Sequence, residues 1–530
     1  MPVERASAGT GTTSAPRAGR REWIGLAVIA LPCLLYSMDL TVLNLAVPSL
    51  SADLKPSSAQ LLWIVDIYGF MVAGSLITMG TLGDRIGRRR LLLLGAAAFG
   101  AASVIAAFSR SAEMLIATRA LLGIAGATLA PSTLSLIRNM FLDPGQRTVA
   151  IGVWVTSYSV GGAIGPLLGG IVLQYFWWGS VFLLGVPVMV VLLVLGPVLL
   201  PEFRNSDAGR LDLFSAALSL AAVLMVIYGL KRIAEDGWGW LPVVSIVAGV
   251  ALGVAFVRRQ RTLRDPLIDL RLFQIPAFSA SLVTYTLGTL VVFGVYIFIA
   301  QYLQLVLGLA PLRAGLWSAP SMVAFVVGSV LVPVIARRVA PAYLMGAGLV
   351  LAAVGFGVLA QVGRGPGLAV IVVGSVVYSL GISPVVILAT DLIVGSAPVE
   401  RAGAASAISE TSSELGGALG IAILGSVGTA VYRSVMADAI PAGMPSEAAE
   451  SARATLGGAV AVAGRLPGQL GGELLGSARE AFTQAMEVTA AISAAVALVT
   501  AVVAVVGLRR VRAGSEPERQ ANLEPAEVAD

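Results

Sequence analysis

Residues 80–90 read GTLGDRIGRRR and join two apolar segments, each long enough to cross a membrane as a helix. The glycines of this stretch allow a tight turn between closely packed helices. Asp84 can pair with Arg85 or Arg88, or it can face the partially positive N-terminus of another helix. A loop that only sets membrane orientation needs arginines but no fixed order, so the spacing G-x-L-x-D-R-x-G-R-R indicates a more specific role. The candidate gating residues are Gly80, Gly83, Asp84, Arg85, Gly87 and Arg88.

The composition of the chain is that of a membrane protein. It has 530 residues, of which 57% are hydrophobic and 12% charged, and its mean hydropathy is +0.88. A soluble domain carries about twice that charged fraction. Apolar segments of the roughly 20 residues that a spanning helix needs recur with short polar breaks and predict an all-α polytopic membrane protein. The fourteen predicted transmembrane helices are 23–47, 59–82, 91–108, 113–137, 149–173, 179–200, 211–230, 240–257, 277–305, 313–336, 342–361, 367–393, 402–430 and 482–508.

The basic residues predict how these helices are oriented. With both chain ends on one side, that side holds 24 arginines, whereas the short loops of the other side hold six basic residues. The positive-inside rule therefore puts both termini in the cytoplasm of a bacterial inner membrane. Residues 1–22 are rich in Gly, Ser, Thr and Arg and predict a disordered cytoplasmic N-terminus. Residues 431–481 predict a long extracytoplasmic loop with short interfacial helices.

Several kinds of chemistry are excluded by the residues that the chain lacks. It has no histidine and a single cysteine, Cys33. These counts exclude histidine-based triads, histidine metal sites, zinc clusters and intramolecular disulfides. Neither Lys55 nor Lys231 follows a glycine-rich loop, so there is no phosphate-binding P-loop. The net charge of +5 lies in loops and forms no nucleic-acid patch. We therefore expect neither an enzyme nor a bound metal or cofactor.

Six charged residues fall inside the predicted spans, where a charge is expensive and indicates function by default. A rise of about 1.5 Å per residue gives Asp39, Asp66 and Arg119 one height in the outer half of the membrane. Glu410 and Glu414 are one helical turn apart, so they share one face near the midplane. The six residues are Asp39, Asp66, Arg119, Asp391, Glu410 and Glu414.

These charges predict a path for protons and cations. A carboxyl group taken out of water can be neutral in one state and ionised in another, and an organic cation can replace the proton. No basic residue in the neighbouring sequence pairs Asp39 or Glu410. One alternative is an Asp66–Arg119 ion pair that only fixes helix packing, and Asp391 is better interpreted as an interfacial residue that reaches water. Aromatic rings could stack on a cation, and the candidate cavity residues are Trp63, Tyr68, Tyr158, Tyr296 and Phe325.

Three motifs together resemble one family. The loop at 80–90 resembles the signature loop of the major facilitator superfamily. Residues 115–119 (LIATR), followed by two glycines, resemble the fourth-helix motif of that superfamily, in which a buried arginine is linked to proton transfer. Residues 161–170 (GGAIGPLLGG) resemble the fifth-helix motif of its drug antiporters. The small residues of that motif suit close helix contact, and its proline suits a bend. The motif residues are Gly161, Gly165, Pro166, Gly169 and Gly170.

Two further matches narrow the resemblance. Residues 38–48 (MDLTVLNLAVP) resemble the first helix of 14-spanning drug:proton antiporters, and residues 63–68 with Glu410 and Glu414 resemble the QacA-type pumps for quaternary ammonium compounds. Phe325 stands about where some relatives carry an aspartate. The resemblance implies an alternating-access cavity between two six-helix bundles. The implied units are 23–200 and 277–508 for the bundles, 201–276 for two inserted helices with cytoplasmic linkers, and 509–530 for a cytoplasmic tail.

The sequence as a whole predicts a proton-coupled antiporter that exports lipophilic, mostly cationic drugs, dyes or antiseptics. By resemblance, Asp39 and Glu410 would carry the proton or the cation, Asp66 and Glu414 would support them, and Arg119 would tune protonation. The expected partners are these small molecules, protons and the lipid bilayer, and we expect a monomer driven by the proton gradient. The alternatives are a dedicated self-resistance exporter of one natural product, a membrane enzyme using only Asp and Glu, and a sensor on a transporter scaffold.

Overall fold

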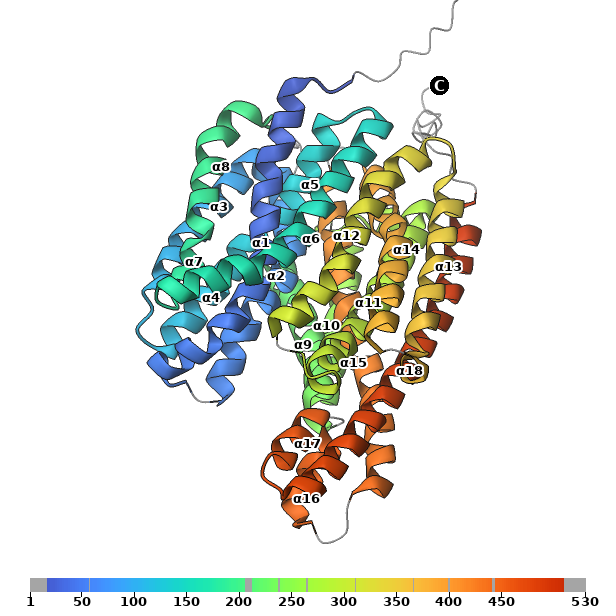
Figure 1. The fold of residues 1–530 in the computed structure, drawn as a ribbon. Helices are drawn as coiled ribbons and strands as arrows, with labels where there is room; N and C mark the ends of the chain where they lie inside the picture. Colours follow the sequence, from blue (N-terminus) through green and yellow to red (C-terminus); the bar gives the residue numbers. More distant parts are fainter. Residues whose placement is uncertain are drawn as a thin grey trace, which may run out of the picture.

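A computed structural model shows a chain that is helical almost throughout (Figure 1). It describes residues 17–56, 58–204, 212–236, 239–263, 266–309, 311–365, 367–398, 401–440 and 444–509. Most of the two predicted tails, 1–16 and 510–530, lies outside the described residues. Arg20, Arg21 and Glu22, predicted to be disordered, instead form the first turn of the first helix. The Glu22 carboxylate stabilises this start by accepting the Gly19 N–H at 2.7 Å.

The first half of the chain forms ten helices. They are α1 (Arg20–Leu54), α2 (Ser58–Ile86), α3 (Arg88–Ala107), α4 (Ala112–Gly126), α5 (Leu129–Met140), α6 (Pro144–Tyr175), α7 (Ser180–Leu183), α8 (Gly185–Leu199), α9 (Leu213–Asp236) and α10 (Trp240–Gln260). Local sequence fixes several of their ends. Ser111 caps α4 by accepting the Met114 N–H, and Asp143 caps α6 by accepting the Gln146 N–H just before Pro144. Both are preferred capping residues because their side-chain oxygens satisfy backbone donors that have no partner within the helix.

The second half begins with the short helix η1 (Leu270–Gln274). It continues with α11 (Pro276–Gln301), η2 (Tyr302–Val306), α12 (Pro311–Ala336), α13 (Pro341–Leu359), η3 (Val362–Arg364), α14 (Gly367–Gly395), α15 (Ala402–Ala439), α16 (Ser446–Ala454), α17 (Leu456–Ala463) and α18 (Gly468–Leu508). Both described chain ends lie at the end of the molecule where α2 meets α3, and α16 and α17 protrude from the opposite end (Figure 1). We call these the signature-loop end and the α16–α17 end.

Twelve helical stretches in the described part of the chain are long and apolar enough to cross a membrane. They coincide with every predicted span except 59–82 and 149–173. Those two spans fall on α2 and α6, which are helical over 29 and 32 residues. The all-helical architecture is therefore confirmed, with twelve candidate spans among the described residues, whereas the count of fourteen stays a prediction.

Glycines bring helices together at the two places where the sequence predicts close contact. On α6, a Cβ at Gly161 would collide with the Leu34 carbonyl of α1, and one at Gly169 would lie 2.9 Å from Cγ1 of Val42. The glycines of the fifth-helix motif therefore set the α1–α6 contact, as small residues do between membrane helices. Gly165 is buried in the same helix, and Pro166 also lies within α6, but its side chain is outside the described residues.

The two inserted helices pack on one another and on both halves of the protein. Gly229 of α9 and Gly249 of α10 allow this pair to approach closely, since a Cβ at either would lie under 3 Å from the other helix. On α2, Phe70 and Ala73 share a buried apolar cluster with Ile227 of α9. Helix α9 also contacts α15. The pair thus lies against one helix from each half of the chain.

The segment 431–481 is more ordered than the predicted loop. Helix α15 continues to Ala439, and α18 begins at Gly468, well before the predicted span at 482. Between them α16 and α17 form a small packed unit: the Tyr432 hydroxyl donates to the Ala452 carbonyl at 2.9 Å, and Met436 and Leu474 are fully buried. The segment contains short helices that pack into a small core through its apolar side chains, and its extracytoplasmic location stays a prediction.

Candidate functional site

An ion pair between α1 and α4 lies in the first half of the chain. Arg119 Nη1 donates to Asp39 Oδ2 at 2.8 Å, and the two side chains are 1% and 13% exposed. The sequence suggested no basic partner for Asp39, and the structure corrects this by bringing in a residue 80 positions away. The equal depths estimated for Asp39 and Arg119 agree with this contact. The two opposite charges neutralise one another in this conformation.

Arg119 is held by several groups besides the carboxylate. Its Nε donates to the Ile64 carbonyl at 3.1 Å, and its guanidinium lies 4.8 Å from the centre of the Tyr68 ring. Arginine suits such a site because its planar fork can serve a carboxylate, carbonyls and a ring together. The alternative of an Asp66–Arg119 pair stays a prediction. Asp66 lies on α2, and its side chain falls outside the described residues.

A second cluster of acids lies on α15. Glu410 Oε1 is buried and has no hydrogen-bond partner among the described residues. Its carboxylate is close enough to interact electrostatically with Tyr36, Tyr158 and Tyr285. One turn further along, Glu414 lies within hydrogen-bonding reach of the Tyr36 hydroxyl. The tyrosines come from α1, α6 and α11, so both halves of the chain contribute to the surroundings of the two acids.

Aromatic rings form a connected layer beside these acids. The Tyr36 ring centre lies 5.9 Å from that of Tyr68 and 5.7 Å from that of Tyr158, which in turn lies 4.8 Å from that of Trp154. Of the five predicted cavity residues, the structure brings Tyr68 and Tyr158 into this layer, and Phe325 is half-buried against the core. Trp63 and Tyr296 are exposed, at 43% and 47%.

Tyr36 is the residue of this layer that the sequence reasoning missed. It lies three positions before Asp39, which puts both residues on one face of α1. That spacing could have identified it. Cys33 lies one turn earlier, buried 3.6 Å from the Thr133 hydroxyl. The same hydroxyl accepts the Trp154 indole N–H at 2.9 Å. In the described residues no group of three or more His, Cys, Asp or Glu could hold a metal ion.

The signature loop connects the two halves of the protein. Asp84 pairs with Arg88, and its two oxygens accept the backbone N–H groups of Gly403 and Ala404 at 3.3 and 3.2 Å. These groups form the N-terminus of α15, whose partial positive charge favours a carboxylate. Asp84 therefore has both kinds of partner that the sequence suggested, an arginine and a helix N-terminus. Gly80 supports the contact, since a Cβ there would lie 2.6 Å from that of Ala407.

The other residues of the loop set its turn. Gly87 has φ of +110°, a conformation that residues with a side chain rarely adopt, so a glycine is required between α2 and α3. Gly83 packs next to Leu91 of α3, and Arg85 lies in the last turn of α2. The loop thus joins α2 and α3 of the first half and lies against the N-terminus of α15 in the second half.

A second connection between the halves was not predicted. Asp391 of α14 accepts from Arg147 Nε at 2.7 Å and from the Thr148 hydroxyl at 2.8 Å, both on α6. The interpretation of Asp391 as an interfacial residue in water is wrong, because its residue surface is 9% exposed. Arg147 was counted only as a loop arginine. We call this contact the α6–α14 latch. The latch lies at the signature-loop end, where α6 begins and α14 ends.

Replacing Asp391 by asparagine is expected to loosen the latch. Removing one partner of a buried ion pair costs about 3–5 kcal/mol, and about 1.4 kcal/mol is a tenfold change in a conformational equilibrium. We expect the signature-loop end to open at least tenfold more often. Spin-label distances between α6 and α14 measure this. The control is Asp143→Asn in the same loop, because asparagine also caps helices. Unchanged distances in Asp391→Asn would contradict the latch.

Sequence comparison agrees with this arrangement. Residues 29–421 match the Major Facilitator Superfamily. The chain belongs to the Major Facilitator Superfamily. Its structure also resembles the solved structures of two other transporters. The human organic anion transporter MFSD10 has a TM-score of 0.57 at 15% identity, covering 91% of this chain and 99% of that one. A bacterial homologue of the human lysosomal transporter Spinster, in an inward-facing and unoccupied conformation, has a TM-score of 0.55 at 20% identity, covering 92% and 99%.

Several curated relatives of this chain are efflux or resistance proteins. Multidrug efflux pump LfrA of Mycolicibacterium smegmatis is 44% identical over 86% of this chain and 90% of that protein. Methyl viologen resistance protein SmvA of Salmonella typhimurium is 37% identical over 84% and 89%. The tetracenomycin C resistance and export protein of Streptomyces glaucescens is 32% identical over 88% of each. The protein is a membrane transporter of this superfamily and is related to multidrug and antibiotic efflux pumps.

Proposed function

We propose that the protein is a proton-coupled antiporter that exports lipophilic, mostly cationic drugs, dyes or antiseptics from the bacterial cytoplasm. Its architecture is that of the 14-spanning QacA-type pumps, with α2 and α6 added to the twelve candidate spans. Two six-helix bundles carry the transport cycle, and α9 and α10 are the inserted pair. Both termini lie in the cytoplasm, so the signature-loop end is the cytoplasmic end.

The observation that carries the proposal is the buried, unpartnered Glu410 oxygen. A carboxylate in a low-dielectric region needs a proton or a cation beside it. Among the described residues no Arg or Lys forms an ion pair with Glu410. The surrounding tyrosines offer ring faces that attract organic cations. A proton and a cationic drug can therefore compete for the same carboxylate, which is the requirement for exchange.

The Asp39–Arg119 pair supplies the link to protons. In the described conformation the pair is closed, and a proton arriving at Asp39 would remove its negative charge and free Arg119 from it. Arg119 would retain the Ile64 carbonyl and the Tyr68 ring. Tyr68 belongs to the aromatic layer beside Glu410 and contacts Arg119 of this pair. Protonation on one side of that layer can thus alter the drug site on the other.

The cycle follows from which end is closed. Asp84 and the α6–α14 latch join the two halves at the cytoplasmic end. In the described conformation these contacts close the cytoplasmic route. Protons from outside would then displace the drug from the carboxylates and release it to the outside. Opening at the cytoplasmic end must break these contacts before the carboxylates can lose protons inward and reload. The membrane potential contributes about 2.3 kcal/mol per charge moved across 100 mV.

Energised vesicles test the proton coupling directly. We expect inverted vesicles to accumulate ethidium when a pH gradient is imposed, and we expect a protonophore to abolish accumulation because it removes the driving force. Vesicles that carry the Asp39→Asn variant control for passive dye binding. Accumulation that is insensitive to the protonophore would overturn proton coupling while leaving export itself intact.

A dedicated self-resistance exporter is the second candidate. It is favoured by the relative named for tetracenomycin C resistance and export. Growth against a panel of unrelated compounds separates the two functions. A broad pump protects against several dyes and antiseptics, and a dedicated exporter protects against one compound only. Protection confined to a single natural product would replace the first proposal by the second.

A further inference from the structure

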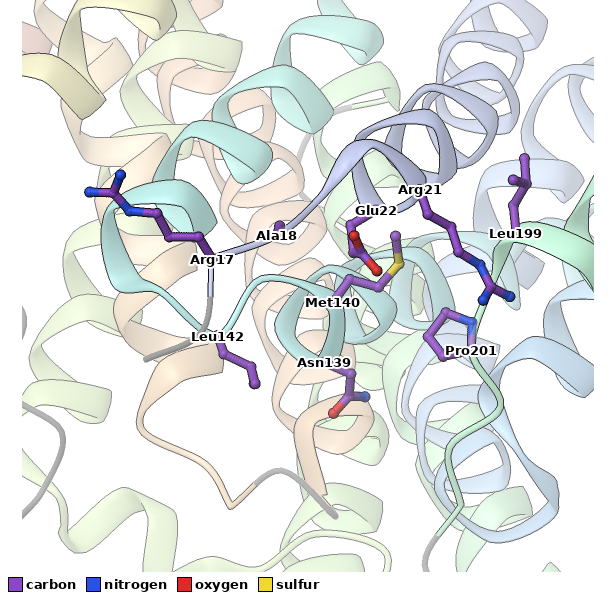
Figure 2. Close-up of a pocket in the computed structure, with 9 residues that line it drawn as sticks. All are labelled: Arg17, Ala18, Arg21, Glu22, Asn139, Met140, Leu142, Leu199 and Pro201. Carbon is purple, nitrogen blue, oxygen red and sulfur yellow. The ribbon is translucent and has the colours of Figure 1, made fainter. Parts of the chain in front are cut away.

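A cavity of about 360 Å³ lies at the signature-loop end, away from the central acids. It is formed by the start of α1, the end of α5 and the end of α8 (Figure 2). Its lining mixes charged side chains, Arg17, Arg21 and Glu22, with apolar ones such as Leu142 and Leu199. Neither the signature loop nor the central acids contribute to it, so the proposed transport cycle assigns it no role.

The charged groups of this cavity are held in separate places. Arg21 Nη2 donates to the Val198 carbonyl at 2.6 Å, which keeps its guanidinium beside the end of α8. Glu22 is held by the Gly19 N–H. In Figure 2, Arg21 and Arg17 lie on opposite sides of the cavity, and Glu22 lies between them. The held guanidinium of Arg21 suits an anion, and the Glu22 carboxylate next to it suits a hydrogen-bond donor on the same ligand.

The positive charge of the cavity is in excess. Arg89, which donates to the Pro197 and Leu200 carbonyls next to the cavity, has its own partner in Glu202 at 3.6 Å. Of the charged groups that line the cavity, Arg17 and Arg21 therefore outnumber Glu22. A ligand with net negative charge matches this better than a neutral zwitterion.

The rim of the cavity continues into surface that faces lipid. Ile24, one turn into α1, is 53% exposed, and Val198 of α8 is 65% exposed. Exposed apolar side chains on membrane helices are covered by acyl chains. With α1 and α8 spanning the membrane as proposed, Arg21 lies between this apolar surface and the aqueous side. A soluble anion would gain nothing from this apolar rim.

We propose that the cavity binds the headgroup of an anionic phospholipid of the cytoplasmic leaflet. Arg21 holds the phosphate, since one guanidinium group can bind two phosphate oxygens at once, and Arg17 adds positive charge on the other side of the cavity. Glu22 accepts a hydroxyl of the headgroup, which favours phosphatidylglycerol over phosphatidic acid. Basic pockets between membrane helices on the cytoplasmic side are typical sites for such lipids. The choice of the cytoplasmic leaflet rests on the orientation proposed above. The choice of an anionic lipid rests only on the residues that line the cavity.

Thermal unfolding of the purified, delipidated full-length chain in detergent tests this site. Phosphatidylglycerol is expected to raise Tm in a saturable way, because a ligand that binds only the folded state stabilises it. Phosphatidylethanolamine and soluble glycerol phosphate are expected to raise it much less. Arg21→Gln should weaken the apparent affinity for phosphatidylglycerol roughly tenfold, as the loss of one charge-assisted contact does. Arg17→Gln should weaken it less, because it removes positive charge from the cavity but no direct contact.

Matched variants make the result decisive. Arg258→Gln, an exposed arginine at the end of α10, controls for general charge and should keep the lipid effect. Glu22→Gln should reduce the preference for phosphatidylglycerol over phosphatidic acid. If Arg21→Gln loosens α1 from α8, then Arg17→Gln still tests the anion site. Equal effects of phosphatidylethanolamine and phosphatidylglycerol, equal effects of soluble glycerol phosphate, or no loss in either arginine variant would overturn the proposal.

Discussion

Replacing Asp39 by asparagine is expected to abolish the export of every substrate while the protein still inserts in the membrane. Asparagine can accept the Arg119 hydrogen bond but carries no charge and takes up no proton. Arg119 would then keep a permanent uncompensated charge in a site where it is 1% exposed. We expect efflux to fall more than tenfold, a change of about 1.4 kcal/mol or more in the transport barrier. Dye efflux from cells with matched protein levels measures this.

Two further variants separate transport from folding. Asp53→Asn removes an exposed acid near the end of the same helix and should leave export unchanged. Removing only Asp39 costs stability because it leaves a buried cation, whereas Asp39→Asn combined with Arg119→Gln removes both charges. The double variant should therefore recover Tm but not transport. Full efflux by Asp39→Asn, or restored efflux in the double variant, would show that the pair is only structural.

The sequence predicted these charges better than it predicted their partners. Helix rise alone put Asp39 and Arg119 at one depth, because depth depends only on position within a span. Which helices face each other depends on packing between segments 80 residues apart. Periodicity contains no such information, so the sequence placed Arg119 at the depth of Asp39 without pairing the two. The tyrosine layer was only partly predicted for the same reason. The sequence shows which residues are aromatic, but it does not show which rings lie next to one another.

The α6–α14 latch shows where sequence reasoning stops. Arg147 lies in a polar break and Asp391 near the end of a span, so each has an ordinary explanation as a residue at the membrane surface. The contact joins residues 244 positions apart. It exists because the two halves of the protein close on one another at this end. The signature loop was predicted more fully, since Asp84 has its partner Arg88 four residues away on the continuing chain.

The spans were the most predictable feature, and the segment after α15 was the least. A helix of about 20 apolar residues matches the thickness of the hydrocarbon core of a membrane, so its length and composition alone indicate a span. Between 431 and 481 the apolar residues are interrupted by Gly, Pro and Glu, so no periodicity of a spanning helix is visible. Their burial depends on α16 and α17 folding back on α15 and α18. Tyr432 and Leu474, distant in sequence, meet there in one apolar cluster.

Glu410→Gln is expected to remove the exchange of cation for proton at the central site. Glutamine keeps the size of the side chain but cannot be charged, so it neither attracts a cationic drug nor releases a proton when the drug binds. We expect cationic dye efflux to fall more than tenfold, and we expect a neutral lipophilic substrate to be affected less. The difference arises because the ring faces of Tyr36 and Tyr158 remain for stacking.

Proton release on drug binding gives the most direct measurement. In detergent, with a pH indicator and little buffer, adding a cationic dye to the original protein should acidify the solution, because the dye replaces a proton on the carboxylate. Glu410→Gln should show little of this signal, whereas Glu480→Gln, an exposed acid on α18, should show all of it. Undiminished release from Glu410→Gln would move the exchange to another carboxylate. If release then disappears in Asp39→Asn, the drug and the proton meet at the α1–α4 ion pair instead, and the tyrosine layer serves only to separate them.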